Sequence, residues 1–280
     1  MSEQGHGQSD CVLVHLKEYN LMIKKPLQLI FILLLTACTT TTPTPTTSPT
    51  SSPTSIPTST PDAPASPTST QETIIMPNIR YLALGDSYTI GEKVAPRDRW
   101  PNQLADLLRN EGLDPEVTII ARTGWTVQEL WEGIQANPPE GTYDMVSLLI
   151  GVNDQYRGYP VDGYREDFRF MLGKAIEYAG GDPKRVVVLS IPDWAFTPFA
   201  GGQDSEPISL QIDEFNAVNL EETQNAGAYY IDVTIISRMG LDDFDLIAPD
   251  RLHPSGKMYK MWAEKTLPVA LEILSEQKGE

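Results

Sequence analysis

Four short polar segments carry the most distinctive side-chain chemistry in this sequence. The first, Gly85-Asp86-Ser87-Tyr88, follows an apolar run, and the last, Asp250-Arg251-Leu252-His253, lies near the C-terminus. A serine hydroxyl becomes a strong nucleophile when a histidine takes its proton and an acid orients that histidine. Ser87, His253 and Asp250 supply these three groups, so the residue types point to nucleophilic catalysis by a serine.

His253 is the only histidine in the sequence after Glu72, so a serine–histidine enzyme would have no second candidate for its base. Taken alone, however, each of these residues has an ordinary structural explanation. Most serines are turn or surface hydroxyls, and an acid and a histidine before a helix are common loop residues. The case for catalysis therefore depends on what the rest of the chain supplies.

Two further segments contain groups that can stabilise an oxyanion. Ala121-Arg122-Thr123-Gly124-Trp125 and Ile150-Gly151-Val152-Asn153-Asp154 each follow a β-like run. Acyl transfer needs hydrogen-bond donors aimed at the developing negative charge, and the Gly124 N–H and the Asn153 side-chain amide are suitable. Turns containing Gly, Asn and Asp are common. Even so, each of the four segments would place at the end of a strand a residue of a type that acyl transfer requires.

Together the four segments resemble the four blocks of the SGNH/GDSL hydrolase family, over a region from about Asn78 to the C-terminal helix. The resemblance implies the SGNH hydrolase fold, a three-layer α/β/α sandwich with a flavodoxin-like parallel sheet of about five strands. It also implies that Ser87 is the nucleophile and that Asp250 and His253 complete the triad. The oxyanion hole would consist of the Ser87 and Gly124 N–H groups and the Asn153 amide.

The hydrophobic pattern from residue 74 onward alternates between strand and helix. Strands are predicted at 79–84, 117–121, 145–150, 186–191 and 229–233, and helices at 100–110, 127–135, 164–178, 209–225 and 255–275. Strands that alternate with helices predict an α/β fold whose parallel sheet is covered on both faces. Residues 89–99 lack periodicity and are expected to form a loop, which would place Ser87 just past a strand end, where such sheets bind their ligands.

Aromatic residues near this sheet edge are candidates for binding substrate. Residues 192–207 follow a predicted strand and should lie at the same edge as Ser87. The candidates for lining an acyl or sugar pocket are Tyr88, Trp125, Tyr156, Trp194, Phe196 and Phe199. Aromatic loop residues serve equally often as packing plugs, so both interpretations stay open. The family is named after the motif Gly-Asp-Ser-Leu, and this chain has Tyr88 in place of the leucine. That position is not a catalytic one.

The N-terminal part of the chain resembles a bacterial lipoprotein leader. Two lysines, a short apolar run and small residues before Cys38 are typical of a signal peptide. Leu35-Thr36-Ala37-Cys38 resembles a lipobox, in which Cys38 would be lipidated. An ordinary signal peptide or a weak membrane anchor is the alternative, and Met22 is a candidate translation start.

A low-complexity segment follows Cys38. Residues 39–70 consist almost entirely of Thr, Ser and Pro, a composition that predicts a disordered or polyproline-like linker. We therefore expect a signal peptide at 1–37, a lipidated linker at 38–72 and a catalytic domain at 73–280. The protein would be extracytoplasmic and held at the cell membrane by its lipid anchor, and exposure at the cell surface stays open.

Composition excludes several functions. The formal net charge of −17 would repel nucleic acids, and the sequence contains no nucleic-acid-binding motif. Both cysteines, Cys11 and Cys38, precede the predicted domain, which therefore has no internal disulfide, thiol nucleophile or cysteine-based zinc site. We expect a monomer that needs no metal or cofactor and whose partners are an ester substrate and the membrane.

The sequence thus favours an extracytoplasmic serine hydrolase that cleaves carboxylic esters through an acyl-enzyme. Two alternatives would use the same residues and stay open. One is a carbohydrate O-acetylesterase. The other is an O-acyltransferase, in which a sugar hydroxyl replaces water as the acceptor. A surface-displayed binding module with an idle site is a third alternative. The presence of Ser87, Asn153, Asp250 and His253 favours an enzyme, but the acyl chain and the alcohol of the substrate are left undetermined.

Overall fold

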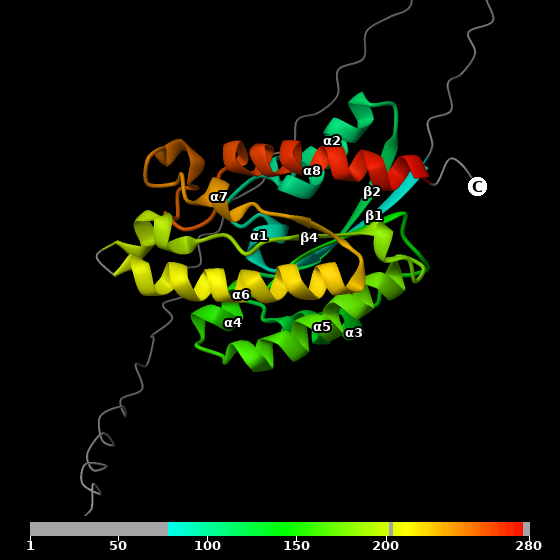
Figure 1. Ribbon diagram of the computed structural model, residues 1–280. Helices are drawn as coiled ribbons and strands as arrows, with labels where there is room; N and C mark the ends of the chain where they lie inside the picture. The colour runs from blue at the N-terminus through cyan, green and yellow to red at the C-terminus, as the bar shows by residue number, and fades with distance from the viewer. Residues whose placement is uncertain (1–77, 202–203, 277–280) are drawn as a thin grey trace, which may run out of the picture. The chain divides into compact units, whose positions relative to one another are not determined.

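The computed structural model describes residues 78–201 and 204–276 (Figure 1). Within them, five parallel strands form one sheet in the order β2-β1-β3-β4-β5. The strands are β1 (Asn78–Gly85), β2 (Asp114–Ala121), β3 (Met145–Leu149), β4 (Val186–Leu189) and β5 (Tyr229–Ile231). This is the flavodoxin-like strand order, so the prediction from the sequence is confirmed. The predicted signal peptide, lipobox and linker lie outside the described residues and stay predictions.

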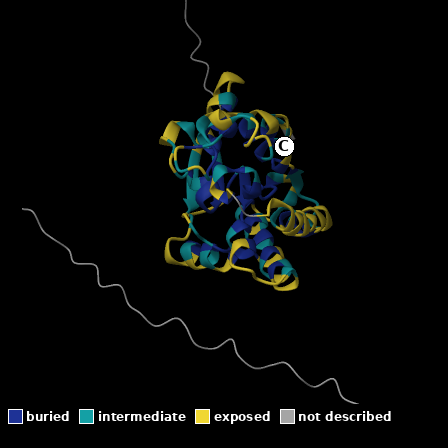
Figure 2. Cartoon of the chain, turned by 90° about the vertical axis from the view of Figure 1, so that its left-hand side faces the viewer, coloured by how far each residue is buried: buried dark blue, intermediate teal, exposed yellow. Residues whose placement is uncertain are grey.

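Five long helices cover the two faces of the sheet. Figure 1 shows α2 (Trp100–Asn110) and α8 (Gly256–Glu276) on one face, and α3 (Val127–Ala136), α5 (Val161–Tyr178) and α6 (Ser205–Ala226) on the other. Figure 2 shows buried residues at the centre and exposed residues along the outer sides of the helices, as expected when each helix buries one apolar stripe. No helix in the described part of the chain is long and apolar enough to cross a membrane.

Short helices fill the connections between these elements. They are α1 (Ser87–Ile90), α4 (Val152–Tyr156), α7 (Thr234–Ser237), and the 3-10 turns η1 (Pro96–Asp98), η2 (Pro183–Arg185), η3 (Trp194–Phe196), η4 (Pro198–Ala200) and η5 (Phe244–Leu246). All predicted strands and long helices are present, with their ends shifted by a few residues.

The loop predicted at residues 89–99 is wrong in its first part, because Ser87 begins helix α1. The Asp86 carboxylate caps this helix by accepting the Tyr88 N–H at 2.9 Å, and Gly91 ends it in the left-handed region at φ 66°. A single helical turn is too short to show hydrophobic periodicity. The cap and the glycine were the only sequence signals for it.

The pairing of β1 with its neighbours brings the polar segments to one edge of the sheet. Gly85, the last residue of β1, pairs with Ala121 of β2 and with Leu149 of β3. Since all strands are parallel, the residues that follow each of them emerge side by side. Strands β3 and β4 are buried throughout, which explains their uninterrupted apolar sequences.

The core between α2 and the sheet provides a direct test of the fold. Leu104 on α2 is fully buried, so Leu104→Ala should lower the free energy of unfolding by about 2–5 kcal/mol, the usual cost of a new core cavity. Leu210→Ala on α6 is the matched control. Because Leu210 is 57% exposed, this substitution should lower the free energy of unfolding by much less. Denaturant titration of both variants would measure the difference. Equal stabilities would contradict the assigned packing of α2.

Candidate active site

A cavity of about 190 Å³ lies at the carboxyl edge of the sheet. Its lining residues are Ser87, Tyr88, Thr123, Gly124, Val152, Asn153, Tyr156, Trp194, Phe199, Leu252 and His253. The structure thus brings Ser87, Gly124, Asn153 and His253 together from four separate segments of the chain. This is the place where an open parallel sheet binds its ligands.

Ser87 is held at the first position of α1. The N–H of a residue at this position makes no bond within its own helix and is available to another acceptor. The turn from β1 into α1 is tight, because a Cβ on Gly85 would lie 2.4 Å from the Leu149 carbonyl oxygen and 2.2 Å from Thr89 Oγ1. Only glycine fits there, which accounts for the first residue of the Gly-Asp-Ser segment.

His253 is paired with Asp250. The distance from His253 Nδ1 to Asp250 Oδ2 is 2.6 Å, and Asp250 Oδ1 accepts the backbone N–H groups of Leu252 and His253, each at 3.0 Å. Partial burial raises the pKa of Asp250, but these hydrogen bonds outweigh it, so the pKa of the carboxyl lies below its ordinary value. Because a carboxylate occupies Nδ1, the Nε2 atom of His253 is the nitrogen left to act as a base.

The loop that carries His253 is fixed on both sides. The Ala248 N–H donates to the His253 carbonyl at 2.7 Å, and an isolated antiparallel bridge joins Ile247 to Pro254. The ring of Tyr88 meets the imidazole edge-on, with 5.6 Å between the ring centroids. Tyr88 therefore supports the imidazole from the segment that carries Ser87, and an aromatic contact of this geometry is a favourable one.

Helix α4 and Arg157, the residue that follows it, hold the Gly124 turn in place. The Asn153 amide donates to the Trp125 carbonyl at 2.9 Å, and Arg157 donates to the Gly124 carbonyl at 2.6 Å. Asn153 Nδ2 also lies 3.4 Å from Asp86 Oδ2, which is long for an N–H···O bond. The second amide hydrogen of Asn153 is therefore only weakly held by the protein.

Gly151, just before α4, meets two constraints that only glycine satisfies. Its φ is +124°, and a Cβ there would lie 2.4 Å from the hydroxyl oxygen of Tyr164. That hydroxyl donates to the Ile150 carbonyl at 3.1 Å and contacts Asn219 Oδ1. The glycine thus lets the chain pass over Tyr164 and turn Asn153 toward the cavity.

Two buried carboxyl groups lie behind the cavity. Desolvation raises the pKa of Asp86 to about 8, although its hydrogen bond from the Tyr88 N–H acts in the opposite direction. Desolvation also raises the pKa of Asp154 to about 7, against the hydrogen bond that its carboxyl accepts from the Val127 N–H at 3.2 Å. Burial disfavours the charged form, so both groups hold a proton at a pH where exposed aspartates have lost theirs.

The predicted substrate-binding residues divide into two groups. Tyr88, Tyr156, Trp194 and Phe199 line the cavity, whereas Trp125 and Phe196 are not among its lining residues. The Trp125 ring packs instead on Gly133 of α3, and Arg238 lies 6.0 Å from the centre of the Phe196 ring.

Three lining residues were not predicted from the sequence, namely Thr123, Val152 and Leu252. Each is adjacent in sequence to a predicted site residue, which was the only available signal. Thr123 Oγ1 donates to Glu92 Oε2 at 2.5 Å, and this bond is the main reason that the pKa of Glu92 lies below its ordinary value. A carboxylate on the α1–η1 connection is therefore bonded to one of the lining residues.

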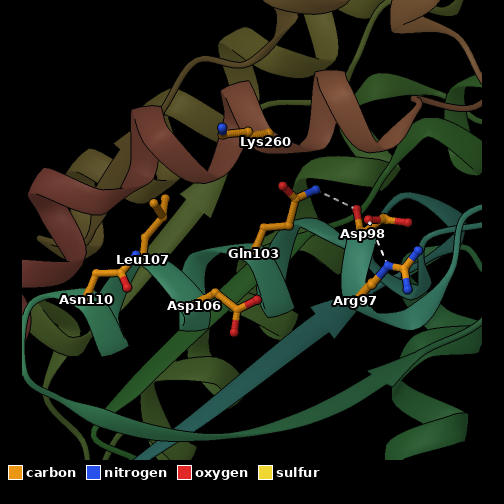
Figure 3. Close-up of a pocket in the computed structure, with 7 residues that line it drawn as sticks. All are labelled: Arg97, Asp98, Gln103, Asp106, Leu107, Asn110 and Lys260. Carbon is orange, nitrogen blue, oxygen red and sulfur yellow. Dashed lines mark hydrogen bonds and ion pairs between the residues drawn. The ribbon is translucent and has the colours of Figure 1, made fainter.

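A second hollow, of about 270 Å³, lies between η1, α2 and α8 (Figure 3). Its lining residues are Arg97, Asp98, Gln103, Asp106, Leu107, Asn110 and Lys260. Gln103 donates to the Asp98 carbonyl at 2.8 Å and to the Gly256 carbonyl at 2.9 Å, which ties α2 to α8. Although larger, this hollow contains no nucleophile beside a base, and we assign it a structural role. Over residues 78–201 and 204–276, no cluster of His, Cys, Asp and Glu is arranged to hold a metal ion.

The strand order, together with a serine and an aspartate-paired histidine at the carboxyl edge, defines an SGNH-type hydrolase. The chain belongs to the GDSL-like lipase/acylhydrolase family, whose profile matches residues 83–261. No curated protein matches the chain.

Solved structures share this fold at low sequence identity. The crystal structure of TesA is 20% identical, with a TM-score of 0.55, and the match covers 70% of this chain and 99% of that one. Axe2, an acetylxylan esterase from Geobacillus stearothermophilus, is 21% identical, with a TM-score of 0.53 and coverages of 71% and 96%. The psychrotrophic esterase EstA from Pseudoalteromonas sp. is 18% identical, with a TM-score of 0.50 and coverages of 70% and 98%.

The raised pKa of Asp154 predicts how stability depends on pH. Its carboxyl keeps a proton in the folded chain that the unfolded chain releases, so its contribution to the free energy of unfolding is lost as the pH rises from about 4 to about 7. Asp154→Asn cannot ionise and keeps an oxygen for the Val127 N–H. This variant should therefore lose less stability than the wild type over that range.

Urea titrations at several pH values would measure this dependence. Asp242→Asn, at an exposed position, is the matched control and should follow the wild type. A wild-type pH dependence in Asp154→Asn would mean that the Asp154 carboxyl is already ionised in the folded protein, contrary to the effect of its burial.

Proposed function

We propose that the protein is a carboxylic ester hydrolase that acts through an acyl-enzyme formed on Ser87. The observation that carries this proposal is the convergence of Ser87 and the Asp250-paired His253 on one cavity. A hydroxyl beside a base that is itself oriented by an acid is the arrangement of nucleophilic catalysis. Membership in the GDSL-like lipase/acylhydrolase family supports the same reaction class.

In the first half of the reaction, Ser87 Oγ attacks the carbonyl carbon of the ester, and His253 Nε2 takes the hydroxyl proton. The imidazolium that forms is stabilised by the Asp250 carboxylate, which stays ionised because its pKa is low. The tetrahedral intermediate then breaks its bond to the alcohol oxygen. His253 returns the proton to that oxygen, the alcohol leaves and the acyl group stays on Ser87.

The negative charge on the carbonyl oxygen needs donors that are already in place. The Ser87 N–H at the start of α1, the Gly124 N–H and the Asn153 amide are the proposed donors. The weakly held second hydrogen of Asn153 supports its part in this role, since a better acceptor can take it without breaking the 2.9 Å bond to the Trp125 carbonyl. A protonated Asp86 would compete poorly for the same hydrogen.

In the second half, a water molecule replaces the alcohol. His253 Nε2 takes a proton from the water, whose oxygen attacks the acyl carbon, and collapse of the intermediate returns the proton to Ser87 Oγ. The carboxylic acid leaves and the free enzyme is regenerated. A sugar hydroxyl in place of water would give acyl transfer. The acetylxylan esterase activity of one structurally similar protein keeps acetylated carbohydrate among the candidate substrates.

Substitution of the proposed triad tests the mechanism. Ser87→Ala and His253→Ala should each lower kcat for p-nitrophenyl acetate by about 10⁴-fold or more, and the double variant should be no worse, because the two residues act as a unit. Asp250→Asn should retain more activity than either.

Labelling with a fluorophosphonate provides an independent measure of the nucleophile. Ser87 should be the labelled residue, and His253→Ala should slow the labelling sharply. No second histidine is present after Glu72 to replace His253. Near-normal turnover by His253→Ala would exclude the proposed mechanism.

The proposed oxyanion hole has a separate test. Asn153→Ala should lower kcat by about 10²–10³-fold with a much smaller change in KM, because the lost donor acts mainly in the transition state. Asn110→Ala, at an exposed end of α2, is the matched control and should keep wild-type kinetics. Thermal unfolding of both variants would separate catalytic loss from misfolding. Activity of Asn153→Ala within a few-fold of the wild type would remove Asn153 from the site.

A further inference from the structure

Trp194 separates the active-site cavity from a second, smaller cavity. The smaller one has a volume of about 10 Å³ and includes Met258 and Ile247 in its lining. Tyr88, Trp194 and Leu252 line both cavities, so these three side chains form the wall between them. Trp194 contributes the largest ring to that wall, and its residue is only 5% exposed.

The indole of Trp194 is fixed in place by buried hydrogen bonds. Its Nε1–H donates to Gln155 Oε1 at 2.9 Å, and Gln155 Nε2 donates in turn to Gln211 Oε1 at 2.8 Å. Rotation of the indole would leave a buried donor and acceptor without partners, which is costly. The rings of Tyr156 and Phe199 also meet Trp194 edge-on, with centroid distances of 5.5 and 6.1 Å.

The backbone that carries Trp194 is equally well held. The Asp193 carboxylate accepts the Ala195 N–H at 3.0 Å and the Arg238 Nε–H at 3.0 Å, and the Asp193 N–H donates to Ser237 Oγ at 2.8 Å. The Phe199 N–H donates to the Arg251 carbonyl at 2.8 Å, which joins this segment to the loop of His253. The wall is therefore a rigid part of the site.

The volume of the active-site cavity limits the size of the acyl group that it can hold. A volume of about 190 Å³ lies below the range of about 300–1,000 Å³ typical of pockets that enclose a drug-sized ligand. The apolar lining of Tyr88, Val152, Trp194 and Leu252 suits a hydrocarbon group, and Thr123 and Gly124 are also among the lining residues. A short acyl chain would fit against the apolar wall, and a longer one would meet the Trp194 ring.

We infer that Trp194, held by Gln155, is the residue that restricts the enzyme to esters of short acyl chains, with acetyl and butyryl as the preferred groups. The inference rests on the proposed ester hydrolysis and adds the substrate class to it. Removal of the indole would join the two cavities and extend the acyl site toward Met258. The same substitution leaves the Ser87, His253 and Asn153 contacts untouched.

The test is a chain-length profile of kcat/KM with p-nitrophenyl acetate, butyrate, hexanoate and octanoate. The wild type should prefer the acetate and butyrate. Trp194→Ala should raise the octanoate-to-acetate ratio by about tenfold or more, because each newly accommodated methylene favours binding. Trp194→Leu, which keeps an apolar side chain, is a second variant should the alanine variant fail to fold, and its ratio should rise by a smaller factor.

Two controls make the result specific. Phe170→Ala removes an exposed aromatic ring on α5 that packs on Trp131, away from the cavity, and should keep the wild-type profile. The ratio of 1-naphthyl acetate to p-nitrophenyl acetate, which varies the alcohol alone, should not change in Trp194→Ala. A shift in this alcohol ratio without a shift in the acyl ratio would place Trp194 beside the alcohol and overturn the inference.

Fluorophosphonate labelling of Ser87 distinguishes failure of this inference from failure of the proposed function. A wild type that is labelled and turns over esters, but whose Trp194 variants keep its acyl profile, would overturn the inference alone. A wild-type preference for the octanoate would overturn it as well. A wild type that is neither labelled nor active on any ester would overturn the proposed function, and the inference with it.

Discussion

The site depends above all on the register of the central strand. Gly85 at the end of β1 is paired at once with Ala121 of β2 and with Leu149 of β3. Helices cover both faces of β1 and β3, so a slip of one residue would exchange the side chains packed on each face. It would also remove Gly85 from its close contact with the Leu149 carbonyl, where no other residue fits. The segments that carry Ser87, Gly124 and Asn153 consequently start at the same level of the sheet.

Burial at that edge of the sheet changes the protonation of two carboxyl groups. Asp86 and Asp154 are buried, and desolvation raises the pKa of both carboxyls. Each accepts a backbone N–H in the first turn of a helix, that of Tyr88 in α1 and that of Val127 in α3. These interactions connect the electrostatics of the site to the geometry of the short elements that carry it.

The histidine loop and the aromatic segment behave as one unit. The Arg251 carbonyl accepts the Phe199 N–H, and Arg251 itself has a φ of +70°, an uncommon conformation for a residue other than glycine. On the other side, the Tyr88 ring contacts both His253 and Trp262. The imidazole therefore packs on Tyr88 from the segment that carries Ser87, and Tyr88 packs in turn on Trp262 of the core helix α8.

The sequence alone was sufficient to predict the α/β fold, every strand and long helix, and the four segments that meet at the sheet edge, because periodicity and strand-end motifs are local signals. It missed α1, whose single turn has no period, and it could not separate Tyr156, Trp194 and Phe199, which line the cavity, from Trp125 and Phe196, which do not. Which way an aromatic ring points is decided by contacts between residues far apart in the chain, such as Trp125 on Gly133 and Trp194 on Gln155. These contacts exist only after packing, and so the shape of the cavity was decided by the tertiary structure.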